Sequence, residues 1–536
     1  MSGARLASFS GRVARTGLDP AKVTLAALLA LWLLWSPRSP DLAAQVYRVH
    51  LFAREGFTLW DENWYAGHYL PAYSLLFPPL AAFLGLHWAG VASVSASTLI
   101  FGRIARERFP GREALASTLF VLGAVGDLFI GRITFAAGVS LALAAVLAAS
   151  HGQYRFSAVL SLACAAASPI AGAFLALAGF ADLISAGRPA RAIALAAPAL
   201  CLTCALALLF PEGGYEGFGV SSLLAAGGLS LGLLALLPRR ERQLRAGAAL
   251  YLAALALSYL IPSPMGSNSV RLGVLFGPAI LAGAVRVSDV RAAISRLAPR
   301  AGHGPGSARA VLAALGALLV LWQLNGPIAQ SLQAAEEPST RPSFYAPVIR
   351  YLSAHSAGGP LRIEVPFSRS HWDAVILGQR FALARGWERQ LDTRYDALFY
   401  LPVLSAGAYD TWLHDTAVRF VVLSDAPLDF SSVAEAALIR HGLSYLRPVY
   451  HSRHWTVYEV LAAEPLASGP GRLTTMSDGD FTLHAVRPGR FLVRIHYTPY
   501  WQVTAGSASV APAAEGWTTV TVARAGTVTL AAQLTI

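Results

Sequence analysis

The chain has 536 residues, of which 55% are hydrophobic and only 13% charged, and its mean hydropathy is +0.50. This composition excludes an ordinary soluble globular protein and predicts that the lipid bilayer is the natural solvent of the chain. A net charge of +12 is also typical of nucleic-acid binding. However, the arginines stand in short clusters between apolar runs, where the positive-inside rule of membrane proteins places them. We therefore expect no nucleic-acid partner.

The N-terminus carries Arg5, Arg12, Arg15 and Lys22 at or before the first apolar run, and no small-residue cleavage site follows it. This pattern predicts a retained membrane helix preceded by a cytoplasmic tail over residues 1–21. Lys22 is the only lysine, and this bias towards arginine and alanine suggests a bacterial genome rich in G and C. The three cysteines all lie within apolar runs and predict neither a disulfide framework nor a cysteine-based metal site.

Eleven apolar segments predict an α-helical transmembrane domain over residues 22–325. They lie at 22–37, 79–102, 114–130, 133–150, 157–168, 170–185, 192–210, 222–237, 246–262, 271–286 and 310–325. Arginine clusters occupy alternate loops, which we expect to be cytoplasmic, and the other loops are acidic or nearly neutral. An odd number of spans puts the N-terminus in the cytoplasm and the C-terminal region outside, as in a multi-pass plasma-membrane protein. The pair 157–168 and 170–185 is either two full spans or a re-entrant pair.

The C-terminal region has more charged residues and short β-type runs, such as Val418–Leu423. It predicts an extracytoplasmic α+β domain over 326–470 and a β-sandwich over 471–536. The sandwich is expected from four runs separated by Pro-Gly and Ala-Gly turns, at Phe481–Val486, Phe491–Tyr497, Trp517–Ala523 and Thr527–Leu534.

The first outward loop, residues 38–78, concentrates carboxylates, histidines and aromatic residues. Its candidate site residues are Asp41, His50, Trp60, Asp61, Glu62, Trp64 and His68. Carboxylates at a membrane surface act as general bases towards a hydroxyl group or bind a divalent cation, and tryptophans stack on sugar rings. The alternative is an interfacial amphipathic helix at 41–54 followed by an aromatic belt.

Two arginines break the positive-inside pattern, Arg132 and Arg271, and the stretch before Arg271 also contains Asn268. A charge at such a place is costly unless it has a function, and arginine binds phosphate through a bidentate fork. Both are therefore candidates for holding the phosphate of a lipid-linked donor. The structural alternative pairs Arg132 with Asp127.

The order of elements resembles the GT-C superfamily of polyprenyl-phosphate-sugar-dependent glycosyltransferases. The first helix leads into an outward loop that begins with an acid, continues to Gly56-x-x-x-Trp60 and Gly67-His68, and closes on Pro78-Pro79-Leu80. Within this superfamily the chain looks similar to bacterial YfhO-like and 6-pyruvoyl-tetrahydropterin-synthase-related membrane proteins. The Pro264–Leu272 stretch and the Tyr497-x-x-x-Trp501 pattern before the terminal sandwich agree with this resemblance.

The resemblance implies transfer of a sugar from a polyprenyl-phosphate carrier to a cell-envelope glycan or lipid acceptor at the outer face. The acid of the first outward loop maps onto Asp41 or onto the Asp61-Glu62 pair. The pair lies about twenty residues into the loop, which puts a Mg²⁺ or Mn²⁺ role for it in doubt. The alternatives are a transporter or flippase of an envelope intermediate and a non-catalytic GT-C-like scaffold.

Other patterns are less specific. His50 and His68 form no HxxH or HExxH motif, so a metal site at the histidines is not predicted. Two stretches of the soluble region, Arg385–Asp392 and His451–Trp455, are dense in charged and aromatic residues and line either a glycan groove or a solvated face. No P-loop, Rossmann fingerprint or GxSxG elbow is present.

Overall fold

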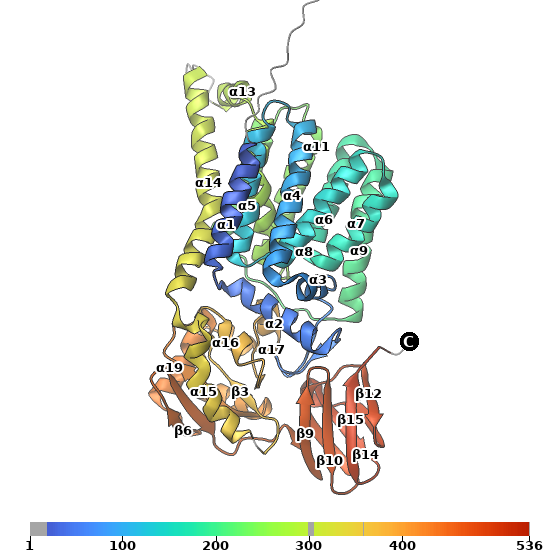
Figure 1. The fold of residues 1–536 in the computed structure, drawn as a ribbon, viewed down its shortest axis with the longest axis vertical. Coiled ribbons are helices and arrows are strands. Elements are labelled where there is room, and N and C mark those ends of the chain that lie inside the picture. Colours follow the sequence, from blue (N-terminus) through green and yellow to red (C-terminus); the bar gives the residue numbers. More distant parts are fainter. Residues whose placement is uncertain (1–18, 298–304, 357, 535–536) are drawn as a thin grey trace, which may run out of the picture.

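The computed structural model describes residues 19–297, 305–356 and 358–534 (Figure 1). Most of the predicted basic tail, with Arg5, Arg12 and Arg15, lies outside the described residues. The N-terminal part is a bundle of long helices, and the C-terminal part lies beyond one end of the bundle. The protein is mostly helical and has a β-rich C-terminal region.

Each of the eleven predicted apolar segments coincides with a helix. These helices are α1 (Pro20–Trp35), α4 (Leu86–Arg108), α5 (Glu113–Ile130), α6 (Ile133–Ser150), α7 (Tyr154–Ala167), α8 (Pro169–Ala186), α9 (Pro189–Leu209), α10 (Val220–Leu236), α11 (Arg242–Leu260), α12 (Val270–Ala284) and α14 (Pro305–Glu336). Several boundaries differ from the prediction by a few residues, and two segments differ more. The segment at 79–102 is broken at Gly85, whose φ of +81° separates α3 (Phe77–Leu84) from α4, and α14 runs past the predicted end at 325.

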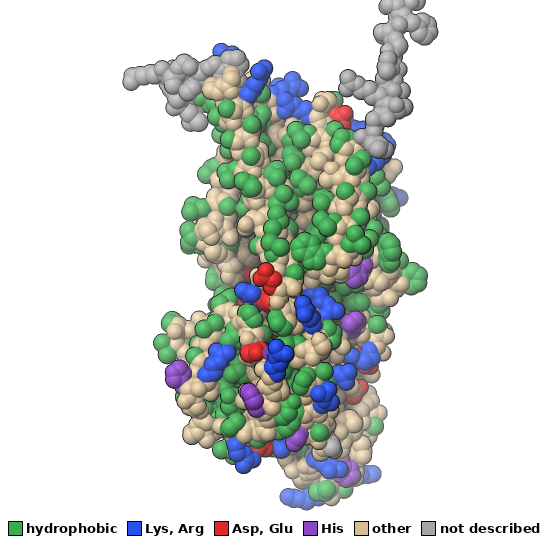
Figure 2. Space-filling view, turned by 60° about the vertical axis from the view of Figure 1, so that its left-hand side comes forward, with side chains coloured by type: hydrophobic (Ala, Val, Ile, Leu, Met, Phe, Trp, Pro, Cys, Tyr) green, Lys and Arg blue, Asp and Glu red, His purple; other side chains and the backbone are tan. Residues whose placement is uncertain are grey.

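Within the described residues, seven helices are long and apolar enough to cross a membrane, or up to nine if each of two bent helix pairs counts as one span. The helices α7 and α10 are shorter. The flank of the bundle carries almost no charged side chains in the view of Figure 2, whereas Lys and Arg gather at the end away from the C-terminal part. These features are compatible with a multi-pass membrane protein, and the number eleven stays a prediction.

The first predicted loop begins with a helix, α2 (Pro40–Glu55), which confirms the helix that the alternative interpretation placed at 41–54. Its interfacial position stays a prediction. It is bent by 75° from α1 and lies across the end of the bundle, between the bundle and the soluble part (Figure 1). Two short strands follow, β1 (Trp60–Asp61) and β2 (His68–Tyr69), which pair as a hairpin. This loop is therefore an ordered layer between the two halves of the protein.

The C-terminal part begins with an α+β unit around a five-stranded mixed sheet in the order β4-β3-β5-β7-β6. Its strands are β3 (Arg362–Glu364), β4 (Ala382–Leu383), β5 (Val418–Ser424), β6 (Leu446–His451) and β7 (Trp455–Val460). Its helices are α15 (Pro342–His355), α16 (Trp372–Ile376), α17 (Arg389–Tyr395), α18 (Ala406–Asp415) and α19 (Val433–His441). The short helix α13 (Val287–Leu297) does not belong to this unit and lies at the opposite end of the bundle. Single turns of 3₁₀ helix occur at Gly266–Ser269, Pro338–Thr340, Ala397–Tyr400, Phe430–Ser432 and Ala514–Gly516.

The chain ends in two antiparallel four-stranded sheets that share one core, which includes the fully buried Phe481, Phe491 and Leu530. One sheet contains β9 (Gly471–Ser477), β10 (Asp480–Ala485), β12 (Trp501–Ala505) and β15 (Gly526–Ala532). The other contains β8 (Ala467–Ser468), β11 (Gly489–His496), β13 (Ala508–Pro512) and β14 (Trp517–Val522). The four predicted strands correspond to β10, β11, β14 and β15, and the sequence pattern missed β8, β9, β12 and β13. Because β8 begins at Ala467, the sandwich also starts before the predicted boundary at 471.

A buried charge network holds the segment that joins β4 to α17. The Arg385 guanidinium donates to both oxygens of Asp392, at 2.8 and 2.9 Å, and lies 3.3 Å from a Glu435 oxygen. The rings of Phe367 and Phe399 lie about 4 Å from it, at 4.1 and 3.9 Å. A buried arginine is tolerated only when paired in this way, so the backbone after Arg385 has a fixed position.

The next residue, Gly386, packs directly on the first loop. A Cβ atom at this position would lie 2.4 Å from the Trp64 ring, and the Tyr65 hydroxyl donates to the Gly386 carbonyl at 2.7 Å. Trp64 is fully buried and stacks on Tyr47 with ring centres 4.0 Å apart. The first loop and the segment 387–390 are thus fixed relative to each other.

We predict that Gly386→Ala lowers the free energy of unfolding by about 1–3 kcal/mol, because the buried Trp64 ring has no room to move away from a methyl group. Thermal unfolding of the purified full chain measures this. Gly407→Ala is the matched control, since Gly407 lies in α18 with nothing within 4 Å of its added Cβ, and it should be neutral or stabilising by up to about 1 kcal/mol. Equal stability of the two variants would contradict the tight contact.

Candidate functional site

A cavity of about 940 Å³ lies where the helical bundle meets the soluble part. Residues of α2, of the turn between α5 and α6, of the loop after α9, of the start of α12 and of the segment 387–390 line it. Its helical walls include apolar side chains such as Phe135, Ile170, Leu206 and Phe210. The volume is that of a site for a substantial ligand.

The first turn of α2 docks on the turn between α5 and α6. Gly131 has a φ of +91°, and a Cβ there would lie 2.6 Å from the Leu42 nitrogen, so only glycine fits. The Ser39 hydroxyl donates to the Ile130 carbonyl at 2.6 Å, and the Gln45 amide binds both the Gly131 carbonyl and the Thr134 backbone N–H. This contact brings Asp41, in the first turn of α2, close to Arg132, which follows Gly131.

Asp41 and Arg132 consequently form an ion pair inside the cavity. The Arg132 Nε donates to Asp41 Oδ2 at 3.0 Å, and its Nη1 lies 3.6 Å from Asp127 Oδ1. The structural alternative, the pairing of Arg132 with Asp127, is therefore present, and Asp41 joins it. Among the described residues, Asp41 Oδ1 has no hydrogen-bond donor, and about a third of the Asp41 side chain is exposed.

Arg271 lines the same cavity without an ionic partner among the described residues. Its guanidinium lies 5.5 Å from the centre of the Phe135 ring, and its Nε is sealed from solvent without an acceptor. Asn268, one turn earlier, also lines the cavity and is held by a 3.3 Å hydrogen bond to the Pro264 carbonyl. An unpaired guanidinium in a partly apolar cavity is suited to bind an anion.

Two glutamates of the loop after α9 face the cavity and were not singled out from the sequence, although the acidity of this loop was noted. Glu212 accepts the backbone N–H of Tyr69, and Glu216 accepts the Ser267 hydroxyl at 2.9 Å. Burial raises the pKa of Glu212 to about 8. Its carboxyl group is therefore mostly protonated at neutral pH.

The soluble part supplies the remaining wall through Trp387, Glu388, Arg389, Gln390 and Phe430. Of the two interpretations of the Arg385–Asp392 stretch, a groove or a solvated face, the geometry agrees with the groove, because residues 387–390 line the cavity. Which ligand this groove binds stays a prediction. The His451–Trp455 stretch instead forms the turn between β6 and β7 and does not line the cavity.

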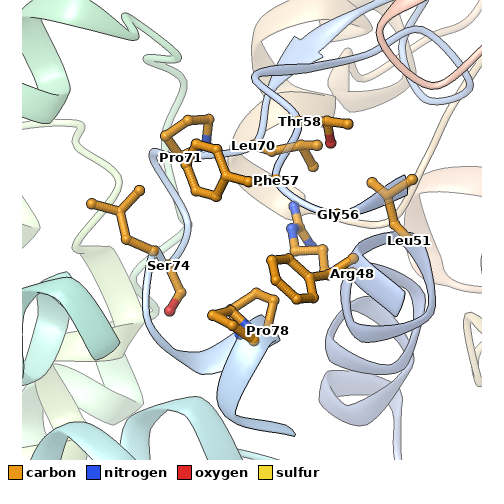
Figure 3. Close-up of a pocket in the computed structure, with 12 residues that line it drawn as sticks. Arg48, Leu51, Gly56, Phe57, Thr58, Leu70, Pro71, Ser74 and Pro78 are labelled. Atoms are coloured by element: carbon orange, nitrogen blue, oxygen red, sulfur yellow. The ribbon is translucent and has the colours of Figure 1, made fainter. Parts of the chain in front are cut away.

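Glu388 is held by an ion pair with Arg48 of α2. Arg48 is buried, stacks on the Tyr73 ring at 4.0 Å, and projects into a second pocket at the end of α2 (Figure 3). That pocket has a volume of only about 30 Å³, enough for one or two water molecules. Arg48 thus supports the wall of the large cavity, and the small pocket is no substrate site.

The acidic pair of the first loop is not part of the cavity. Asp61 and Glu62 are fully buried between the loop and the terminal sandwich. Asp61 accepts the Tyr47 hydroxyl at 2.9 Å, and Glu62 accepts the backbone N–H of Gly479 at 2.7 Å. Burial raises the pKa of both carboxyl groups well above their usual values. Neither residue lies where a substrate in the cavity would reach it.

The other candidates of the first loop also lie elsewhere. Trp60 belongs to the core of the sandwich, where its ring meets those of Tyr69 and Trp501, and Trp64 packs against Gly386. His68 is fully buried, and burial lowers its pKa to about 3, so its ring is neutral. His50 is exposed and bonds Gln379 at 2.7 Å.

Of the ten residues proposed from the sequence, Asp41, Arg132, Asn268 and Arg271 meet in one cavity. The described part of the chain contains no group of three or more His, Cys, Asp or Glu side chains that is arranged to hold a metal ion. The arrangement therefore offers an anion-binding guanidinium, a carboxylate with one free oxygen, and apolar walls.

No protein-family model matches the chain, and no curated protein is significantly similar to it.

Proposed function

We propose that the protein is a GT-C-type membrane glycosyltransferase that moves a sugar from a polyprenyl-phosphate carrier to a cell-envelope acceptor. The observation that supports this proposal best is Arg271, a guanidinium without an ionic partner among the described residues, in a cavity that also contains a carboxylate. Placing such a cation in a partly apolar site is costly unless an anion joins it.

The donor phosphate would bind Arg271, with Arg132 adding positive charge beside it. The apolar residues Phe135, Leu206 and Phe210 of the same cavity would contact the first isoprene units. As the bond between the sugar C1 and the phosphate oxygen breaks, the electron pair stays on the phosphate, and the two guanidinium groups stabilise the developing charge.

Asp41 is the proposed general base. Its Oδ2 is held by Arg132, and its Oδ1 remains available to accept the proton of the acceptor hydroxyl as the oxygen attacks C1. Arg132 therefore orients the carboxylate. Asp61 and Glu62, the alternative pair, are used in this proposal only to join the first loop to the sandwich.

The proposal places eleven helices across the plasma membrane, with the N-terminus in the cytoplasm and the cavity and soluble part outside. Arginines of the loops 103–112 and 239–245 would then face the cytoplasm, as the positive-inside rule requires. A lipid-linked donor suits this location, since soluble nucleotide sugars are absent there.

We predict that Arg271→Gln lowers kcat/KM for a polyprenyl-phosphate sugar by about 10- to 100-fold, the effect of losing a hydrogen bond to a charged group. Radiolabelled donors incubated with purified protein and a membrane-envelope extract measure this transfer. Arg419→Gln, at an exposed arginine on β5, is the control and should leave transfer unchanged. Wild-type protein that moves the labelled lipid across a vesicle without consuming it would support a flippase instead.

We predict that Asp41→Asn lowers kcat by about 10²- to 10⁴-fold while donor binding persists, because the amide cannot accept the acceptor's proton. Asp61→Asn should leave kcat within a few fold, since Asp61 lies outside the cavity. Single-turnover transfer and equilibrium donor binding separate the two effects. If Asp61→Asn lowered kcat more than Asp41→Asn does, Asp61 would be the general base instead.

We predict that a cysteine at Asp425 reacts with a membrane-impermeant maleimide in intact cells, whereas a cysteine at Arg106 reacts only after lysis. Both variants are made in a chain whose Cys164, Cys201 and Cys204 are replaced by alanine. Asp425 is exposed in the soluble part, and Arg106 lies at the end of α4. If only the Arg106→Cys variant were labelled in intact cells, the orientation in the membrane would be the opposite of the proposed one.

A further inference from the structure

Three planar groups that line the cavity stack on one another and are here called the aromatic wall: Trp387, Arg389 and Phe430. The guanidinium carbon of Arg389 lies 5.0 Å from the centre of the Trp387 ring and 4.6 Å from that of Phe430. Phe430 is 69% exposed, which is unusual for a phenylalanine in a part of the protein with its own core.

The aromatic wall is rigidly supported from behind. The Trp387 ring stacks on the buried His371 ring, with centres 3.2 Å apart, and its Nε1 donates to the Pro40 carbonyl at 2.9 Å. Arg389 donates to both oxygens of Asp429, at 2.8 and 3.1 Å. A surface that is already ordered loses little conformational entropy when a ligand binds.

The aromatic wall also carries no net charge, in contrast to Arg271. Although burial opposes it, hydrogen bonds from His371 and Arg389 hold the pKa of Asp429 below its usual range, so Asp429 is ionised and neutralises Arg389. Burial lowers the pKa of His371. The cavity thus has an ionic end, with Arg271, Arg132 and Asp41, and an aromatic surface on the C-terminal part.

We infer that the aromatic wall binds a neutral sugar ring of the acceptor. The apolar C–H face of a sugar ring stacks on aromatic surfaces, and its hydroxyl groups need polar partners at the edge, which Glu388 and Gln390 supply. A phosphate would instead bind the unpaired Arg271. The inference rests on the proposed function, because it divides the same cavity between a donor phosphate and an acceptor sugar.

The test is equilibrium binding of neutral tetrasaccharides of mannose, galactose, glucose and arabinose to the purified full chain, measured by titration calorimetry. We expect wild-type protein to bind at least one of them, and Phe430→Ala to bind it about five- to tenfold more weakly. Phe430→Tyr should bind as the wild type does. Val403→Ala is the control, since Val403 is 77% exposed, lies outside the cavity and should leave binding unchanged.

A transfer assay then separates the inference from the proposed function. With an active acceptor, Phe430→Ala should raise the acceptor KM by the same factor and leave the donor KM and kcat unchanged. Absence of binding to all four sugars, or equal binding by Phe430→Ala and wild type, would overturn the aromatic wall as a sugar site. Sugar binding that depends on Phe430 without any transfer from a lipid-linked donor would instead overturn the proposed transferase alone.

Discussion

The first turn of α2 lies so close to the turn between α5 and α6 that position 131 has room only for glycine. Hydrogen bonds from Ser39 and Gln45 close this contact on both sides. Because of it, Asp41 meets Arg132, α2 crosses the end of the bundle, and the loop behind α2 supports the soluble part. A shift of one ångström at this contact would separate the carboxylate from its arginine and open the seam on which Gly386 and Trp64 pack.

The charges of the cavity are distributed unequally, and this distribution gives the site its chemical character. Arg132 is balanced by Asp41 and Asp127, Arg389 by Asp429, and Arg48 by Glu388. Arg271 forms no ion pair of its own among the described residues, and its Nε has no acceptor. In a partly apolar cavity, where electrostatic interactions are weakly screened, a guanidinium without a bonded acceptor favours an anionic ligand.

Sequence patterns predicted what depends on local hydropathy and failed where burial is decided by distant residues. The apolar segments and the helix at 41–54 were found because their periodicity and length are local signals. Nothing near Asp61 and Glu62 shows that they are buried, because their partners Tyr47 and Gly479 come from α2 and from the terminal sandwich. Likewise Phe430 reads as an ordinary residue of a turn, since only the tertiary fold brings it to a cavity that begins at Asp41.

The cavity walls come from residues as early as 41 and as late as 430. Synthesis proceeds from the N-terminus, so the helices with Asp41, Arg132 and Arg271 are made well before the segment with Trp387 and Arg389. A chain interrupted at α14 therefore holds the ionic half of the cavity and lacks its aromatic half. The cavity is complete only when the segment with Trp387 and Phe430 has folded against the first loop and the bundle.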